Sequence, residues 1–242
     1  MSEGKSRIAR VCAAVLLLFD IDGTLLLRAS AAHRAALLDA LHGVYGLSDP
    51  GAATVLAAGR TDGQIGRSIA VACGLPARRF DELAGDFQTA VITAFERRCP
   101  PTLAKHVAPG IRELLDGLSA DPAARTSLLT GNYEPIARMK LDRAGIGHHF
   151  PPGQGAFGSD AEQRDLLGPI ARARAGTEQS PYPREQTTII GDTPLDIACA
   201  RADGLRVIAI ATGPYAAAAL AAADAVAADA YALRVILRSA SG

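Results

Sequence analysis

The sequence carries no net charge, because its 25 lysine and arginine residues balance its 25 aspartate and glutamate residues. Proteins that bind nucleic acid or an anionic membrane through a charged surface carry an excess of positive charge. We therefore expect neither nucleic acid nor a membrane among the partners. Lysine itself occurs only at Lys5, Lys105 and Lys140, which we attribute to composition rather than to function.

Cysteine is scarce, and its four positions, Cys12, Cys73, Cys99 and Cys199, lie far apart. Without a CxxC pair they indicate neither a zinc site nor a disulfide framework. We expect them to be buried thiols in a reducing compartment.

Segments typical of secretion or membrane insertion are missing as well. The apolar stretch Val11–Phe19, which follows Arg7 and Arg10, stops at Asp20 without a small-residue cleavage pattern, so we interpret it as part of a core strand. No segment approaches the roughly 20 apolar residues that a membrane-spanning helix needs. We expect a soluble cytoplasmic protein.

The most informative part of the chain is the junction at which the apolar run Val15–Phe19 meets Asp20 and Asp22. Such a run, followed by a turn-forming glycine, is typical of a buried parallel strand, and open α/β sheets bind their ligands at the carboxyl ends of strands. A strand that ends between two acids lets both side chains turn toward one crevice. Two negative charges buried together need a cation, so the junction indicates a divalent metal.

The rest of the chain falls into two parts. Helical periodicity at Ala31–Leu41, Ile65–Cys73 and Phe80–Phe95, with no convincing strand between them, indicates a separate helical lobe. From residue 107 helices and strands alternate, which builds a parallel sheet. We expect a discontinuous core domain, 1–27 and 107–242, with an inserted helical domain, 28–106. The expected core elements are helix Gly110–Leu118, strand Thr126–Thr130, helix Pro135–Ala144, helix Glu162–Ala175, strand Thr187–Ile190, helix Leu195–Ala202, strand Arg206–Ala211, a helical stretch Ala216–Ala223 and a surface loop Gly176–Arg184.

Two later strands also end in polar residues. Strand Thr187–Ile190 leads into Gly191 and Asp192, with Asp196 four residues further on. The segment Ser127–Leu129 leads into Thr130-Gly131-Asn132, a hydroxyl followed by free backbone amides. Turns and helix N-termini of this kind bind phosphate oxygens well.

In this order the motifs resemble those of the haloacid dehalogenase-like hydrolase superfamily, which has a strand with DxDGT, a strand ending in Ser or Thr, a Lys or Arg, and a strand with GDxxxD. The resemblance covers the chain to about residue 27 and from about residue 107 onward. It implies a Rossmann-like α/β core, in which helices flank a parallel sheet, and a helical type I cap in place of the inserted lobe.

The resemblance also implies covalent catalysis with Mg²⁺. Asp20 would be the nucleophile that forms an aspartyl-phosphate, and Asp22 would protonate the leaving group and then activate water. For this second role we expect cap closure and a neighbouring anion to raise the pKa of Asp22. Mg²⁺ would be held by Asp20, by Asp192 and by the backbone carbonyl of Asp22. Asp196 would contact the ion through water or lie outside its ligand set, or it would cap its helix.

Phosphate-binding groups are implied at the strand ends. Thr130 and the amides of Gly131 and Asn132 would hold the phosphoryl oxygens, and Gly23 with Thr24 would form the turn that presents Asp22. The alternative for Thr130 is an ordinary turn hydroxyl.

Two residues compete for the role of balancing cation. Many relatives have a Lys-Pro pair before the last motif, and Arg164 stands in that region here. Lys140 resembles a variant in which the helix after Gly131-Asn132 carries the lysine. A lysine on an amphipathic helix is also typical of a solvated face, so both assignments stay open.

The lobe offers fewer signals. Arg60 and Thr61, in a glycine-flanked turn, are the best candidates for substrate contact, with Arg60 meeting a carboxylate or hydroxyl of the substrate or lying exposed in its turn. The five histidines show no metal-ligand spacing, and the pair His148-His149 is typical of a surface loop.

We therefore expect a phosphoric monoester hydrolase, a Mg²⁺-dependent phosphatase that acts as a monomer or homodimer on a small phosphorylated metabolite and is similar to phosphoglycolate phosphatase-like enzymes. A sugar-phosphate mutase is the alternative within the fold. A dehalogenase would not need Asp22, and a phosphonate hydrolase would need a cap lysine, for which only Lys105 lies nearby. A binding module without turnover is the alternative from another class, although no member of the catalytic set is missing.

Overall fold

The computed structural model describes residues 14–239, so the expectations for Lys5, Cys12 and the two arginines before the first strand lie outside the described residues. Six parallel strands form a single sheet, which confirms the expected α/β class. The strands are β1 (Val15–Phe19), β2 (Ala124–Thr130), β3 (Ala156–Phe157), β4 (Thr187–Gly191), β5 (Arg206–Ile210) and β6 (Ala225–Ala227), arranged in the order β3-β2-β1-β4-β5-β6.

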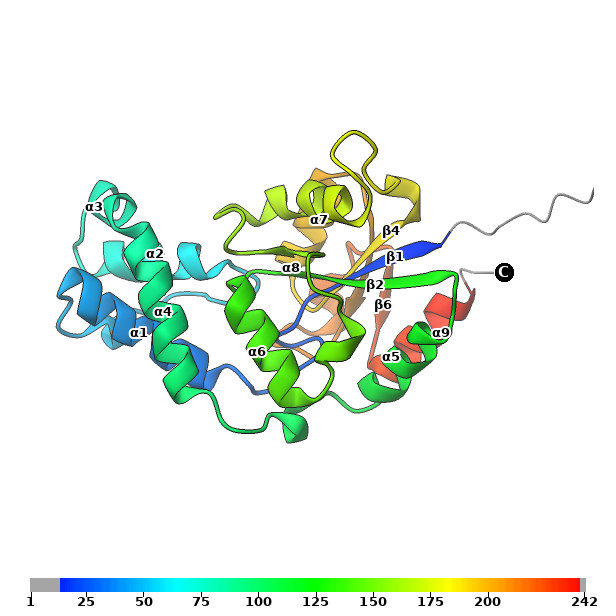
Figure 1. The fold of residues 1–242 in the computed structure, drawn as a ribbon, viewed down its shortest axis with the longest axis horizontal. Helices are drawn as coiled ribbons and strands as arrows, with labels where there is room; N and C mark the ends of the chain where they lie inside the picture. Colours follow the sequence, from blue (N-terminus) through cyan, green and yellow to red (C-terminus); the bar gives the residue numbers. More distant parts are fainter. Residues whose placement is uncertain (1–13, 240–242) are drawn as a thin grey trace, which may run out of the picture.

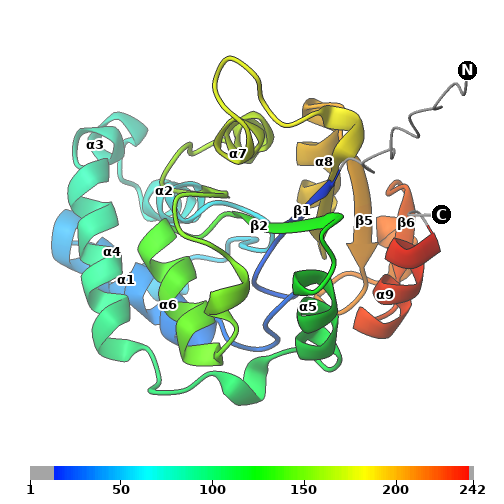
Figure 2. The same ribbon diagram turned by 45° about the vertical axis from the view of Figure 1, so that its right-hand side comes forward.

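The helices of the described chain are α1 (Ala31–Tyr45), α2 (Asp62–Ala72), α3 (Ala77–Glu82), α4 (Ala84–Arg98), α5 (Ile111–Ser119), α6 (Glu134–Ala144), α7 (Leu167–Ala175), α8 (Pro194–Ala202) and α9 (Ala230–Ser239). Helices cover both faces of the sheet, and consecutive side chains of β1 point to opposite faces. Leu17 and Phe19 pack with α5, α6 and α9, whereas Leu16 and Leu18 pack with α7 and α8. Figure 2 shows these two layers on opposite sides of the strands.

Helices α1–α4 gather at one end of the molecule (Figure 1). They share an apolar cluster of their own, which includes Leu41, Phe87 and Phe95. Tyr133 and Ile136, at the start of α6, join this cluster from the sheet side. The arrangement suits a helical insert, and its boundaries at residues 28 and 106 stay a prediction.

Two chain segments connect these helices to the sheet. Leu26 and Val107 form an antiparallel bridge, and the amide of Leu27 donates to the carbonyl of His106 at 2.7 Å. The imidazole Nδ1 of His106 lies 2.9 Å from the carbonyl oxygen of Leu27. The two segments therefore run side by side where the chain leaves and re-enters the sheet.

Three expected helices differ from the structure. The stretch Phe80–Phe95 breaks at Leu83, between α3 and α4, and the break lets the Phe80 and Phe87 rings pack with centroids 5.2 Å apart. A single helix was expected because the apolar spacing continues across the break. The expected helices Glu162–Ala175 and Ala216–Ala223 are shorter, since the first begins at Leu167 after a 3-10 turn and the second is a 3-10 turn, Ala217–Leu220.

Two edge strands and a helix were not expected. Strands β3 and β6 have two and three residues, which is too short for an alternating pattern to be recognised. Helix α9 follows an alanine-rich stretch, in which the apolar spacing does not indicate where a helix begins. The loop Gly176–Arg184 lies mostly on the surface, as expected.

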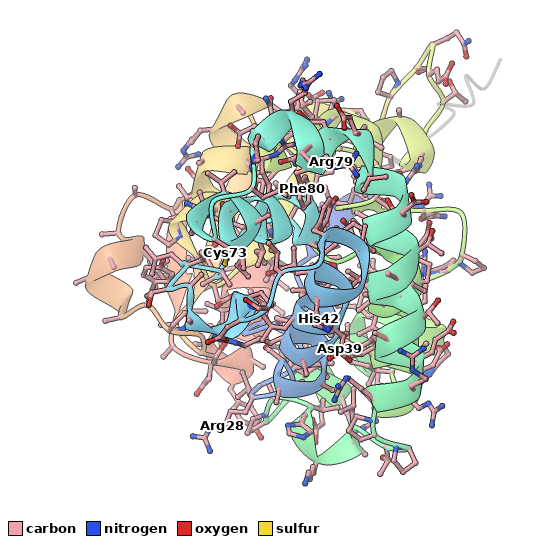
Figure 3. All side chains as sticks on the ribbon, turned by 90° about the vertical axis from the view of Figure 1, so that its left-hand side faces the viewer. Arg28, Asp39, His42, Cys73, Arg79 and Phe80 are labelled. Carbon is pink, nitrogen blue, oxygen red and sulfur yellow. The ribbon has the colours of Figure 1, made fainter. Side chains whose placement is uncertain are left out.

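The expectation of buried cysteines is wrong for Cys73. Of the described cysteines only Cys199 is buried. Cys99 is partly exposed, and Cys73 follows the last residue of α2 at the surface (Figure 3). All three are free thiols. Over residues 14–239, no helix combines the length and the apolar character needed to cross a bilayer.

Candidate active site

Three neighbouring strands deliver polar side chains to one edge of the sheet. β1 ends directly before Asp20, β2 ends with Thr130, and β4 ends directly before Asp192. Because the strands are parallel and in register, their carboxyl ends lie at the same edge. This edge faces the helices α1–α4, and a cavity lies between them.

Asp20, Asp192 and Asp196 form an acidic cluster, in which one carboxylate oxygen of each lies within 4.8 Å of the other two. All three side chains are buried. Burial raises the pKa of Asp20 to about 6, and burial together with the charge of Asp20 raises the pKa of Asp192 to about 8. The described residues thus leave negative charge uncompensated, which favours a bound cation.

Asp192 has the features of a metal ligand. Its Oδ2 atom is buried without a hydrogen-bond partner among the described residues, while Oδ1 accepts a hydrogen bond from Thr24 Oγ1 at 3.3 Å. A Cβ atom at Gly23 or Gly213 would clash with Oδ2, so both glycines are required for the backbone to lie this close. A buried oxygen without a donor is costly unless a cation binds it, and Mg²⁺ prefers oxygen ligands.

Asp196 uses both of its oxygens within the protein. Its Oδ2 accepts hydrogen bonds from the amide and the hydroxyl of Thr193, at 3.0 and 2.7 Å, and thereby caps α8. Its Oδ1 accepts from Arg164 Nη2. Asp196 therefore contributes to the cluster mainly by positioning Arg164 and the start of α8.

Arg164 is the cation of the acidic cluster. Its guanidinium is buried, and Nη2 lies 3.5 Å from Asp20 Oδ1 in addition to its bond with Asp196. The thiol of Cys199 donates to the Arg164 carbonyl at 3.2 Å and so fixes the 3-10 turn that carries the arginine.

Lys140 is placed at the other carboxylate. Its ammonium group donates to Asp22 Oδ2 at 2.6 Å, to Asn132 Oδ1 at 2.7 Å and to His33 Nδ1 at 3.1 Å, which uses all three of its hydrogens. The side chain is fully buried, so a solvated position for Lys140 is excluded. The structure therefore brings both candidate cations to the site, each beside a different carboxylate.

The contacts of Lys140 extend into the helical lobe. Because an ammonium group only donates, His33 accepts at Nδ1 and carries its hydrogen at Nε2, which lies 3.1 Å from Asp62 Oδ2. The same Asp62 oxygen accepts from the amide of Tyr133 at 2.8 Å. Hydrogen bonds thus connect Asp62 on α2 and His33 on α1 to Lys140 and Asp22.

These partners shift the pKa of Asp22 in the direction opposite to our expectation. Burial acts to raise the pKa of Asp22, but the positive charge of Lys140 and its hydrogen bond outweigh burial and lower the pKa below its usual value. Asn132 Nδ2 adds a hydrogen bond to Asp22 Oδ2 at 3.0 Å. The expected increase in pKa is not produced by the residues of the protein.

The turn after β2 packs tightly against the lobe. The Asp62 amide donates to the Gly131 carbonyl at 2.9 Å, and a Cβ at Gly131 would clash with the Arg60 carbonyl. Thr130 is fully buried, and its hydroxyl accepts a long bond of 3.4 Å from the Asn132 amide. The turn therefore has no room for a side chain at Gly131.

Arg60 and Thr61 are placed differently. Arg60 lines the cavity and donates to Ser68 Oγ at 3.1 Å. Thr61 is fully buried, and its hydroxyl caps α2 through the Gln64 amide and donates to the Glu162 carbonyl at 2.7 Å. The hydroxyl of Thr61 is therefore used for docking the lobe, and it does not line the cavity.

The cavity has a volume of about 980 Å³. The sheet edge contributes Asp20, Asp22, Asp192 and Arg164, while the lobe contributes aliphatic side chains together with charged ones, among them Arg34 and Asp62. The lining includes Asp20, Asp22, Asn132, Arg164 and Asp192 on the sheet side and Leu37, Val55, Arg60, Ile65 and Ile69 on the lobe side.

Sequence reasoning missed the roles of His33, Asp62 and Gly213. Asp62 lies in the glycine-flanked turn of Arg60 and Thr61, for which the expected role was substrate contact. His33 belongs to no motif, and its one available signal was a histidine on the apolar face of the helix Ala31–Leu41, together with Ala36, Leu37 and Ala40. Gly213 follows β5 in an ordinary turn sequence, and its role depends on the approach of Asp192 from another strand.

Comparison with known proteins places this geometry in a family. The model of the haloacid dehalogenase-like hydrolases matches residues 17–201, and a second model, described as HAD-hydrolase-like, matches residues 168–235. No curated protein matches the sequence.

Solved structures share the fold at low sequence identity. A β-phosphoglucomutase from Clostridium difficile has a TM-score of 0.66 at 12% identity, covering 95% of this chain and 96% of that one. A hydrolase from Pseudomonas syringae has a TM-score of 0.62 at 21% identity, covering 93% and 98%. CbbY from Rhodobacter sphaeroides, solved in complex with phosphate, has a TM-score of 0.60 at 17% identity, covering 89% and 94%. With a family model that spans most of its length, the chain belongs to the haloacid dehalogenase-like hydrolase family.

Proposed function

We propose that the protein is a Mg²⁺-dependent phosphatase that hydrolyses a small phosphorylated metabolite through an aspartyl-phosphate on Asp20. The observation that carries the proposal is the buried, unpartnered Oδ2 atom of Asp192 beside Asp20, in a cluster whose pKa values are raised. Asp20, Asp192 and the backbone carbonyl of Asp22 would hold Mg²⁺. When bound, the ion would neutralise the charge of the phosphate and of the carboxylates around it.

In the first step a carboxylate oxygen of Asp20 attacks phosphorus. The bond between phosphorus and the ester oxygen breaks, and the leaving oxygen takes a proton from Asp22, which becomes a carboxylate. Arg164 lies beside Asp20 Oδ1 and compensates the negative charge that gathers there. Thr130 and the turn that follows it would orient the phosphoryl oxygens.

In the second step Asp22 takes a proton from a water molecule, whose oxygen attacks phosphorus. The bond between phosphorus and Asp20 breaks, phosphate leaves, and Asp22 is again protonated for the next substrate. Lys140 and Asn132 hold the Asp22 carboxylate in one orientation throughout. The pKa that Lys140 lowers would rise when a phosphate dianion arrives next to Asp22.

Residues 28–106 would act as a cap that closes over the cavity. The paired segments at Leu26 and Val107 are the natural hinges, since they are the points at which the lobe joins the sheet. The aliphatic side chains that the lobe adds to the lining, among them Leu37, Val55 and Ile69, would then help to exclude water from the phosphoryl group.

The substrate and the fate of the phosphoryl group are tested together. Purified protein with Mg²⁺ is assayed for free phosphate and, in parallel, for isomer formation on phosphoglycolate, sugar phosphates and p-nitrophenyl phosphate. We expect free phosphate in every productive reaction. Isomer formation without phosphate release would identify a mutase, a transfer that the fold also permits, and Mg²⁺ binding without any turnover would identify a binding module.

A further inference from the structure

Asp116, His148 and His149 form a second group of metal-ligating side chains, remote from the proposed reaction. Asp116 lies on α5, and the two histidines lie in the 3-10 turn Gly147–His149. One ligand atom of each lies within 4.8 Å of the other two, and none of the three residues lines the cavity of the candidate active site. Sequence reasoning assigned the histidine pair to a surface loop because the third residue comes from another element.

The spacing of the group suits a tetrahedral ion. His149 Nε2 lies 3.4 Å from Asp116 Oδ1, which is long for a hydrogen bond. Two ligands bound at about 2.0–2.1 Å to a tetrahedral Zn²⁺ are about 3.3–3.4 Å apart. The third ligand atom, a nitrogen of His148, lies within 4.8 Å of the other two, so the three atoms must draw closer together around a bound ion.

The hydrogen bonds of His149 orient its ring as a ligand requires. Ser119 Oγ lies 2.9 Å from Nδ1. When the Nδ1 hydrogen is donated to this hydroxyl, the lone pair of Nε2 faces Asp116, which is the arrangement found around histidine ligands.

The surroundings hold the group in place without occupying it. Thr126 donates to the His149 carbonyl at 2.7 Å and anchors the turn to β2. Arg112 is a positive charge on the same helix as Asp116. Its guanidinium donates to the carbonyls of Ala144 and Gly145, so it does not compete for the ligand atoms.

We propose that Asp116, His148 and His149 bind Zn²⁺, with water as the fourth ligand. Two imidazoles and a carboxylate favour Zn²⁺ over Mg²⁺, whereas the all-oxygen acidic cluster has the opposite preference. A bound ion would fasten the end of α5 to the turn that follows α6.

The test is a Zn²⁺ titration of the chelator-stripped full-length protein by calorimetry, with excess Mg²⁺ present to occupy the acidic cluster. We expect one Zn²⁺ to bind, and His148→Gln and Asp116→Asn each to weaken binding by at least about ten-fold. Both side chains are exposed, so these variants keep the fold. Ser119→Ala should weaken binding by about ten-fold through the orientation of His149.

The matched control is His42→Gln, an exposed histidine on the outer side of α1 (Figure 3), which should leave Zn²⁺ binding unchanged. A titration in the Asp192→Asn background should give the same Zn²⁺ affinity as the parent protein. The proposal is overturned if the protein binds no Zn²⁺ under these conditions, or if binding persists unchanged in both His148→Gln and Asp116→Asn.

Discussion

Asp20 and Asp22 are separated by one residue at the end of the same strand, yet their surroundings shift their pKa values in opposite directions. At Asp20 burial prevails and raises the pKa to about 6, although Arg164 lies beside it. At Asp22 the charge of Lys140 prevails over burial and lowers the pKa. The difference shows that burial alone does not determine the state of a carboxylate, because the balance between burial and the charges around it decides the direction of the pKa shift. Arg164 is one positive charge beside the three carboxylates of the acidic cluster, so the Asp20 side needs a further cation from solution, whereas Lys140 balances Asp22.

The largest expected effect is that of Asp20→Asn. The amide cannot attack phosphorus, so turnover should fall by at least about 10⁴-fold, as is usual when a nucleophile is removed. Phosphate release under saturating Mg²⁺ is the measurement. Asp39→Asn, a substitution on the lobe surface, is the control, and substantial activity of Asp20→Asn would exclude the covalent mechanism.

Asp22→Asn tests the other side of the comparison. We expect turnover to fall by about 10²–10⁴-fold, since the general acid and base is lost. Mg²⁺ affinity should stay close to that of the parent protein, because only the backbone carbonyl of Asp22 is assigned to the metal. If Mg²⁺ binding falls together with turnover, the two carboxylates do not have separate roles.

Gly213→Ala tests the approach to Asp192. The added Cβ would clash with Asp192 Oδ2, and we expect the displaced carboxylate to weaken Mg²⁺ binding by about 10–100-fold, as for other disturbed metal ligands. Gly117→Ala is the matched control, since no atom lies within 4 Å of the position of its added Cβ. Equal Mg²⁺ affinities in the two variants would remove Asp192 from the ligand set.

Lys140→Met should make the surroundings of Asp22 resemble those of Asp20, where burial sets the direction of the pKa shift. Without the ammonium group burial dominates, so the pKa of Asp22 rises. Asp22 must hold a proton for the first step, so the basic limb of the pH profile of kcat/KM moves to higher pH. Arg138→Met removes a positive charge from the same helix outside this network and is the control. An unmoved basic limb in Lys140→Met would contradict the assignment of Asp22 as the general acid.

The smallest effect concerns stability. Because the pKa values of Asp20 and Asp192 are raised to about 6 and about 8, the folded protein binds more protons than the unfolded chain between about pH 4 and pH 8. Stability without metal should therefore fall as pH rises through this window. Mg²⁺ replaces these protons, so the increase in Tm that it causes should be larger at about pH 8 than at about pH 5.

Thermal melts with and without Mg²⁺ check this sign. Asp192→Asn removes the larger of the two shifts and should flatten the pH dependence. A Mg²⁺-induced change in Tm that is the same at both pH values would contradict the raised pKa values.

The sheet and its polar edge could be predicted from the sequence because each depends on local patterns. Val15–Phe19 and Thr187–Ile190 are apolar runs that end directly at acids, and parallel topology then brings those ends together. The family follows from the same residues.

The network around Asp22 could not be predicted in this way. His33 and Asp62 reach it only because α1 and α2 pack against the sheet edge, and nothing in their local sequence encodes that distance. The choice between Lys140 and Arg164 failed for a related reason. The question assumed one balancing cation, whereas the fold supplies one for each carboxylate.

Helix α6 belongs to both parts of the molecule. Ile136 packs into the apolar cluster of α1–α4, Leu141 packs into the cluster beneath the sheet, and Lys140 projects from the same helix into the network of Asp22. Exchanging the lobe between the two hinges for that of another protein would remove the apolar partners of Ile136. It would also remove His33, so Lys140 would lose one of its hydrogen-bond acceptors. To transfer substrate specificity with a lobe, the residues of α6 that face the lobe would therefore have to be changed together with it.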